Sequence, residues 1–205
     1  TEEGPKGPEP VTAVVEIIFQ KPHQQRIVAT SEKKVGDVVE QRVEITALDN
    51  YDGWHRLQDG KDASRWRMDL LLKDQIKALR ANTWENLAFY RGLELHGGKV
   101  DDLGETNVSG VACEKLAFRH ESGIVFFRYF DQATGRLMLT ETEQGGSIRE
   151  EGEIMADGIR FPKRVVTTTK QVDGKERSIT VNFDKVAVNE TFPSSLFAVP
   201  SFLAR

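Results

Sequence analysis

The sequence contains one cysteine, Cys113, among its 205 residues. A single cysteine forms no disulfide within the chain and no zinc site built from several thiolates. Such a chain suits the cytosol, and it equally suits a bacterial periplasmic protein that folds without disulfides. Because Cys113 lies in a strand-like pattern with no base at a recognisable spacing, we expect a small buried hydrophobe with no catalytic role.

Long uncharged segments and an excess of positive charge are lacking as well. The longest stretch without Asp, Glu, Lys or Arg is Thr191–Ala204, which has 14 residues, whereas a membrane-spanning helix needs about 20. The chain has 28 Lys and Arg against 32 Asp and Glu, a net charge of −4. This balance gives no broad attraction for phosphate backbones. We therefore expect no membrane span and no nucleic-acid partner.

Recognisable catalytic motifs are absent. The sequence has no glycine-rich phosphate loop and no G-x-S-x-G nucleophile motif. Its four histidines are at least 24 residues apart and form no metal-binding pair. We expect no cofactor, no bound metal and no enzymatic activity.

Apolar and β-branched residues, in contrast, are plentiful. Leu, Ile, Val and Phe number 55, enough for a packed core, and 19 Val, 10 Ile and 14 Thr favour β-strands. Alternating patterns separated by short turns such as Asp157-Gly158 predict an antiparallel meander. The predicted strands are Val11–Phe19, Gln25–Glu32, Val38–Leu48, Val111–Arg119, Ile124–Asp131, Leu137–Glu143, Ser147–Ala156, Arg164–Val172 and Glu176–Val188.

The period of two assigns side chains to opposite faces of these strands. We expect one buried, concave side to carry Val39, Val43, Ile45, Ile179, Val181 and Phe183. We expect the solvated side to carry Glu40, Arg42, Glu44, Ser178, Thr180 and Asn182.

One segment departs from the strand period. Within Asp69–Arg91, Leu72, Ile76 and Leu79 are spaced by three and four residues, which predicts a helical stripe. Thr83 is positioned to cap a second helix that ends at the last residue of this segment. A helix inserted in a meander must bury its stripe against the sheet, as a permanent plug or as a lid that opens. We adopt the lid as the hypothesis.

The first ten residues are polar and rich in proline and glycine. They predict a disordered lead-in over residues 1–10, followed by a single domain over residues 11–205. A chain that opens in such a spacer is compatible with a signal sequence that has been removed. The mildly acidic charge and a solvated outer face lead us to expect a monomer.

Several segments match a known family in their order and spacing. They are Ile17–Pro22, Arg26-Ile27, Asp52–Trp54, Asp69–Arg91, Tyr129–Asp131, Thr134–Leu137, Asp157–Pro162, Ile179–Phe183, Val186–Asn189, Phe192-Pro193, Leu196-Phe197 and Pro200. In this order the chain resembles the LolA-like superfamily of outer-membrane lipoprotein-sorting proteins. The resemblance covers roughly residues 11–202 and is strongest in the C-terminal third.

The resemblance implies a mainly β fold of the α+β kind, a curved, half-open antiparallel β-barrel with a helical lid inserted in mid-chain. It implies a non-enzymatic protein, periplasmic or secreted, that carries a lipid or the acyl chains of a lipoprotein in an apolar trough. Each buried CH₂ group contributes about 0.8 kcal/mol, so such a trough can take up a lipid without a covalent step.

Eight apolar residues are the candidates for the trough and its lid. They are Phe19, Val43, Ile45, Leu72, Ile76, Leu79, Phe118 and Phe126. The expected partner is a lipid or an acylated lipoprotein. The alternative function is an envelope sensor or scaffold that binds a protein partner on the same sheet, and a filled trough would favour it.

Overall fold

The computed structural model describes residues 2–4, 7–9, 11–35, 38–170 and 174–201. They form two compact units, Thr1–Arg91 with Thr191–Arg205 and Gly92–Glu190, and each unit is described by itself. The lead-in over residues 1–10 and the single domain over residues 11–205 stay predictions. Within that lead-in, Glu2–Gly4 (β1) and Gly7–Glu9 (β2) form a short antiparallel pair.

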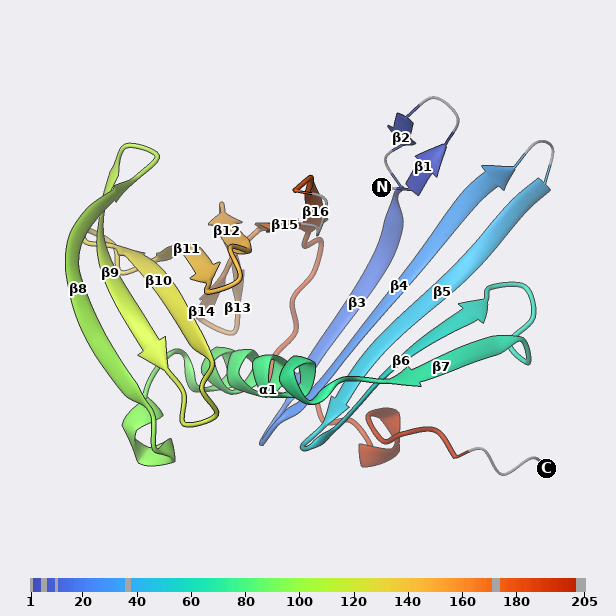
Figure 1. Ribbon diagram of the computed structural model, residues 1–205, viewed down its shortest axis with the longest axis horizontal. Coiled ribbons are helices and arrows are strands. Elements are labelled where there is room, and N and C mark those ends of the chain that lie inside the picture. The colour runs from blue at the N-terminus through green and yellow to red at the C-terminus, as the bar shows by residue number, and fades with distance from the viewer. Residues whose placement is uncertain (1, 5–6, 10, 36–37, 171–173, 202–205) are drawn as a thin grey trace. The chain divides into compact units, whose positions relative to one another are not determined.

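The first unit is built on a five-stranded antiparallel sheet in which strands adjacent in sequence are adjacent in space (Figure 1). Its strands are β3 (Ala13–Gln20), β4 (Gln24–Val35), β5 (Val38–Asp49), β6 (Asp52–Asp59) and β7 (Trp66–Leu70). The α-helix α1 (Lys73–Ala88) follows β7 directly. A short 3-10 helix, η2 (Ser194–Leu196), lies in the C-terminal segment that returns to this unit.

The second unit contains a seven-stranded antiparallel sheet and a separate hairpin. After the 3-10 helix η1 (Leu93–His96), the sheet takes β8 (Lys99–Val108), β9 (Val111–Arg119), β10 (Val125–Asp131), β11 (Leu137–Thr142), β12 (Ser147–Glu151), β15 (Arg164–Lys170) and β16 (Glu176–Asn182). The hairpin pairs β13 (Ile154–Ala156) with β14 (Ile159–Phe161). Its turn residues Asp157 and Gly158 have φ of 47° and 78°. Two consecutive positive φ angles define the type I′ turn that this dipeptide predicts.

The expectation of a mainly β, antiparallel fold with one α-helix inserted in mid-chain is confirmed for the described residues. The expected helix over Asp69–Arg91 is shorter, because its first two residues complete β7. The expected cap at Thr83 is wrong, since this residue is buried in the middle of α1. The sequence did not predict β6, β7 and β8, because their charged and polar side chains obscure the alternation. It also did not predict the three-residue strand β14, and the predicted strand Ser147–Ala156 is in fact two strands, β12 and β13, in different sheets. The end predicted for β15 at Val172 lies outside the described residues.

The two faces of the first sheet are covered by different segments. Register places Phe19, Gln25, Leu48 and Gly53 side by side on one face, which we call the helix face. The opposite face, which we call the C-terminal face, carries a buried cluster that packs against Val199. The cluster consists of Ile45, Ala47 and Trp54, with Val28, Val43 and Met68 partly buried beside it. On that face the Trp54 indole N–H donates a 2.8 Å hydrogen bond to the carbonyl of Phe197.

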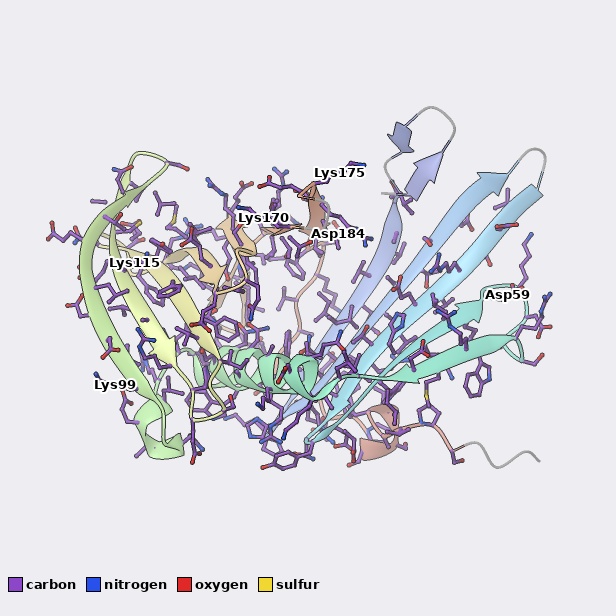
Figure 2. The ribbon with its side chains drawn as sticks, in the orientation of Figure 1. Asp59, Lys99, Lys115, Lys170, Lys175 and Asp184 are labelled. Carbon is purple, nitrogen blue, oxygen red and sulfur yellow. The ribbon has the colours of Figure 1, made fainter. Side chains whose placement is uncertain are left out.

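The second sheet also has apolar side chains on both faces. One face carries a buried cluster of Val108, Cys113 and Tyr129. Figure 2 labels Lys115 of β9. Its ammonium lies 5.0 Å from the ring centroids of both Phe127 and Tyr129 on this face. Cation–π attraction of this kind stabilises a charged head on an aromatic surface.

The opposite face of the second sheet carries a buried arginine, Arg128. Arg128 lies with its guanidinium 5.8 Å and 5.1 Å from the ring centroids of Phe118 and Phe126, and it donates a 2.8 Å hydrogen bond to Thr140. Glu150 shares this face, because it is two residues from Ile148, the partner of Thr140. Burial raises the pKa of Glu150 to about 7, although the positive charges of Arg128 and Arg136 oppose the rise. Removal of a carboxylate from water disfavours its ionised form.

The predicted alternation between buried and exposed residues holds in part. Ile45 is buried and Val43 half-buried between exposed Arg42 and Glu44, and Val181 and Phe183 are half-buried beside exposed Asn182. Two residues of the predicted buried set are exposed: Val39 is 40% and Ile179 50% accessible. Ile179 lies on β16, an edge strand with a neighbouring strand on one side only, and Val39 lies near the start of β5.

We expect the hydrogen bond between Trp54 and Phe197 to fix the C-terminal segment on the sheet. Replacing Trp54 with Phe keeps a large ring and removes the donor, so the free energy of unfolding should fall by about 1–3 kcal/mol in urea titrations. The same substitution at the exposed Trp66 is the control and should change it by no more than about 0.5 kcal/mol. Equal losses for the two variants would show that the hydrogen bond contributes nothing.

The raised pKa of Glu150 predicts a pH-dependent stability. Its ordinary value is 4.5 and its folded value about 7, so between these pH values the folded protein binds more protons than the unfolded one. The free energy of unfolding therefore falls as the pH rises through this window and levels off above it. Urea unfolding at a series of pH values should show that Glu150→Gln removes this part of the fall. Parallel pH profiles for wild type and variant would contradict the prediction.

Candidate functional site

The helix α1 lies on one end of the helix face. The Thr83 hydroxyl donates a 2.8 Å hydrogen bond to the side-chain carbonyl of Gln25, and both residues are buried. At Gly53, an added Cβ would lie 3.0 Å from the side chain of Ile76. The helix contacts β3, β4 and β5. Glycine at position 53 therefore lets the helix approach the sheet closely.

The fully buried side chains of the helix are small, polar or charged, and none of them belongs to the predicted apolar stripe. The buried residues within Lys73–Ala88 are Ala81, Thr83 and Glu85. Leu72 precedes the first helical turn, where its backbone N–H donates to the Gln75 side chain, and its own side chain is 71% exposed. The other two stripe residues, Ile76 and Leu79, are half-buried.

Next to the helix, the helix face carries an apolar strip on β3 and β4. The strip consists of Val15, Ile17, Ile27 and Ala29, in which Ile17 pairs with Ile27 and Val15 with Ala29. All four side chains are half-buried, and Phe19, next to the strip on β3, is exposed. The alternation in the sequence of β3 by itself places Val15, Ile17 and Phe19 on one face. The register between β3 and β4 is needed to show that Ile27 and Ala29 lie beside them.

On β5 and β6 the strip gives way to polar side chains. The Nε2 atom of His55 forms a 2.8 Å hydrogen bond with Oε1 of Glu44. Thr46 lies opposite His55, in the same row as Ile17 and Ile27. The apolar surface is therefore bounded by a polar margin on one side and by α1 at one end. A narrow apolar surface with a polar margin can accept a chain of CH₂ groups and leave a polar head in water.

The eight candidate trough and lid residues do not share one surface. Phe19, Ile76 and Leu79 belong to the helix face or to the helix on it, whereas Val43 and Ile45 point to the C-terminal face. Successive side chains of a strand alternate between its two faces. Leu48 points to the helix face, so positions 43 and 45, which are an odd number of residues away from it, point to the opposite face. Phe118 and Phe126 are directly paired with each other in the second sheet, where both are buried. Assignment of these residues to ligand binding stays a prediction.

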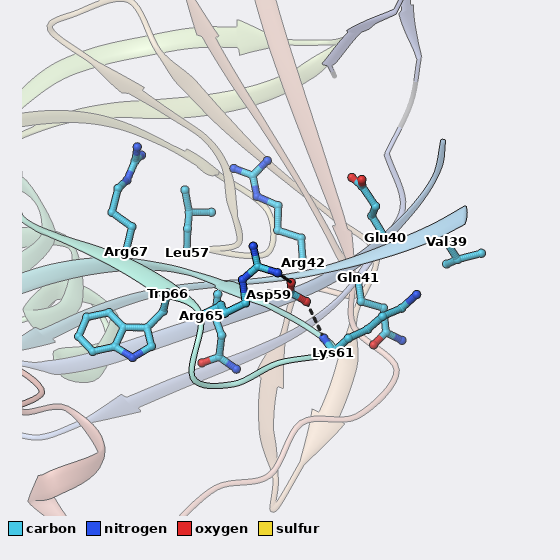
Figure 3. A pocket seen from close by; sticks show the side chains of 11 residues that line it. Val39, Glu40, Gln41, Arg42, Leu57, Asp59, Lys61, Arg65, Trp66 and Arg67 are labelled. Atoms are coloured by element: carbon cyan, nitrogen blue, oxygen red, sulfur yellow. Dashed lines mark hydrogen bonds and ion pairs between the residues drawn. The ribbon is translucent and has the colours of Figure 1, made fainter. Parts of the chain in front are cut away.

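A hollow of about 600 Å³ lies at the other end of β5, β6 and β7. Figure 3 shows Arg42, Leu57 and Arg67 directed to one side of these strands and Trp66 to the other. Asp59 forms an ion pair of 3.8 Å with Arg65 at its margin. Most of the lining side chains are polar or charged, so this hollow is unsuited to an acyl chain.

The structure gives the surroundings of Cys113 and tests the described residues for clusters of metal ligands. Cys113 is fully buried, and burial, followed by the negative charge of Asp131, raises the pKa of its thiol. A raised pKa keeps the thiol protonated and unreactive. Across the described ranges, no three His, Cys, Asp or Glu side chains gather closely enough to hold a metal ion. None of the helices in these ranges combines the length and the apolar character needed to cross a bilayer.

Comparison with known proteins gives similarity to solved structures only. No protein-family model matches the chain, and no curated protein matches it. An outer membrane lipoprotein-sorting protein domain from Vibrio parahaemolyticus is 13% identical with a TM-score of 0.43, over 78% of this chain and 76% of that one. A DUF1329 family protein from Desulfovibrio piger ATCC 29098 is 13% identical with a TM-score of 0.41, over 92% and 90%. A lipoprotein-sorting protein domain is thus among the solved structures similar to this chain, at low sequence identity and low TM-score.

Proposed function

We propose that this protein is a non-enzymatic binding protein of the periplasm that carries a lipid, or the acyl chains of a lipoprotein, on the helix face of its first sheet. The observation that carries the proposal is the apolar strip of Val15, Ile17, Ile27 and Ala29 beside α1. Its side chains are only half-buried within a strand pair that has α1 at one end. Covering such a strip with an acyl chain would remove further apolar surface from water, at about 25 cal/mol per Å².

The helix α1 acts in this proposal as a lid. A plug would bury large aliphatic side chains, and truncation of one such residue to Ala typically costs about 2–5 kcal/mol. The buried residues of α1 are instead Ala81, Thr83 and Glu85. A hydrogen bond such as the one between Thr83 and Gln25 contributes only about 0.5–1.5 kcal/mol net, because water replaces it on opening. Separation of α1 from the sheet should therefore cost less free energy than removal of an aliphatic plug.

The trough proposed here uses only some of the residues expected from the sequence. Phe19 extends the strip, and Ile76 and Leu79 lie on the helix that borders it. Val43 and Ile45 belong to the opposite face and are not assigned to this trough. Phe118 and Phe126 are kept as a separate candidate surface of the second unit.

A sensor or scaffold that binds a protein partner is the second candidate. Strand β3 lies at the edge of the five-stranded sheet, and Val14 on this strand is 79% exposed. An edge strand offers unpaired backbone groups to an extended peptide. In that case β3 would bind peptide while the apolar strip remains without a lipid.

We expect acyl-chain binding to depend on Ile17. Ile17→Asn places an amide in the strip and should weaken binding of a fluorescent fatty acid by about tenfold, since a buried Ile contributes about 1.5–3 kcal/mol. The control is Val14→Asn, on the same strand with its side chain on the other face, and it should leave binding unchanged. Native mass spectrometry of the gently extracted protein should show a co-purified lipid. Equal affinities of the two variants for the fatty acid, together with the absence of a co-purified lipid, would contradict the carrier function.

We expect the Thr83–Gln25 hydrogen bond to control how readily α1 opens. Thr83→Val keeps the shape of the side chain and removes the donor, so amide hydrogen exchange in Lys73–Ala88 should become faster by about five- to tenfold or more. Combining it with Gln25→Leu should recover part of the loss, because neither partner then has an unsatisfied polar group.

The control for this measurement is Thr140→Val in the second sheet, which makes the same change at an equally buried threonine. It should lower the free energy of unfolding without accelerating exchange in α1. An acyl ligand should also change exchange in α1 of the wild type. Exchange in α1 as slow as in the core strands, with and without ligand, would identify the helix as a permanent plug.

A further inference from the structure

Two arginines project from the C-terminal face, the face opposite the apolar strip. Arg26 on β4 lies opposite Ala47, and Arg56 on β6 lies opposite Ile45 and Met68. The residues between and beside them are apolar and belong to the cluster around Trp54. Both cations are therefore set into an apolar surface, where a charge without a counter-charge is costly.

Arg56 is held between two tryptophan rings. Its guanidinium carbon is 5.9 Å from the ring centroid of Trp54 and 5.8 Å from that of Trp66. Its Nε is buried and has no hydrogen-bond partner, and no carboxylate among the described residues forms an ion pair with it. Burial, followed by the positive charge of Arg26, lowers the pKa of Arg56. The rings fix the position of the guanidinium but do not neutralise it.

Arg26 is only partly compensated. Its Nη1 is 3.5 Å from a carboxylate oxygen of Glu16, whose side chain is largely exposed, and its Nε is buried without a hydrogen-bond partner. Asp49 on β5 and Asp52 on β6 lie on the same face, but among the described residues neither forms an ion pair with Arg26 or Arg56. The Arg56 guanidinium therefore has apolar and aromatic side chains beside it and no paired carboxylate.

We propose that Arg56 and Arg26 bind an oxyanion, a phosphate or carboxylate group, that is joined to an apolar chain. A planar guanidinium fixed by aromatic stacking presents its N–H groups in the fork geometry that matches two oxygens of such a group. Val28, Val43 and Met68 lie beside the two arginines and provide a surface for the first carbons of the attached chain. Trp66 is exposed at the margin of this surface, whereas the Arg26 side chain is only 16% exposed. This site goes beyond the proposed function, because it lies on the face that α1 does not cover.

The test compares three probes by isothermal titration calorimetry on the full chain. Dodecyl phosphate, used below its micelle concentration, carries the oxyanion and the chain. Dodecyl maltoside carries the chain with a neutral head, and inorganic phosphate carries the oxyanion alone. The variant is Arg56→Gln, and the control is Arg67→Gln, which removes the same charge from the opposite face on β7.

We expect Arg56→Gln to weaken binding of dodecyl phosphate by about tenfold or more, because charge-assisted hydrogen bonds are lost. Arg67→Gln should change it by less than about twofold, and Arg56→Gln should not alter binding of dodecyl maltoside. Inorganic phosphate that binds with the same dependence on Arg56, and as tightly as dodecyl phosphate, would support the oxyanion site and identify a free anion as its ligand. Dodecyl phosphate that binds much more tightly would identify a lipid head.

Two further variants keep the proposal falsifiable if Arg56→Gln does not fold. Arg26→Gln should produce a similar loss, and Arg56→Lys, which keeps the charge without the planar fork, should produce an intermediate one. Absence of saturable binding by either oxyanion probe, or equal affinities in wild type and Arg56→Gln, would overturn the proposal. Loss of fatty-acid binding in Ile17→Asn with oxyanion binding intact would separate this site from the proposed carrier function.

Discussion

The first sheet has apolar side chains on both faces, and each face needs its own cover. One cover is α1, which follows the sheet directly, and the other is the segment around Phe197, more than a hundred residues later. The second unit is inserted between these two covers in the chain. The hydrogen bond from Trp54 to the Phe197 carbonyl fixes the later cover, and the sheet would otherwise expose Ile45 and Ala47. The two segments that cover this sheet therefore come from opposite sides of the second unit in the sequence.

The two covers differ in their chemistry, and the functional proposal depends on this difference. The C-terminal segment places Val199 against a buried cluster of Ile45, Ala47 and Trp54. The helix instead buries Ala81, Thr83 and Glu85 and donates a hydrogen bond to Gln25. Apolar contacts lose stability when they separate, because their surfaces return to water, whereas polar contacts regain hydrogen bonds there. For this reason the functional proposal takes the helix, and not the C-terminal segment, as the cover that moves.

Both sheets place an arginine within an apolar face and stack it on aromatic rings. Arg128 has a hydroxyl acceptor in Thr140, and its charge acts on the pKa of Glu150. Arg56 has Trp54 and Trp66 beside it, and burial together with the positive charge of Arg26 lowers its pKa. Aromatic stacking stabilises both guanidinium groups, but only an anion would balance the second. The same local arrangement is thus a packed feature in one sheet and a candidate site in the other.

Local patterns in the sequence determined the class of fold. The period of two along Val11–Phe19 and Val38–Leu48, and the Asp157-Gly158 turn, specify strands and a hairpin because they depend on neighbouring residues alone. Only the tertiary structure decided that Val43 and Ile45 face away from Phe19, since register between strands relates residues far apart in the sequence. The same holds for Thr83, which has the chemistry of a helix cap but is buried inside α1 where Gln25 accepts its hydrogen bond. Arg26 and Arg56 carry no sequence signal for a shared site, because their neighbourhood arises from three adjacent strands.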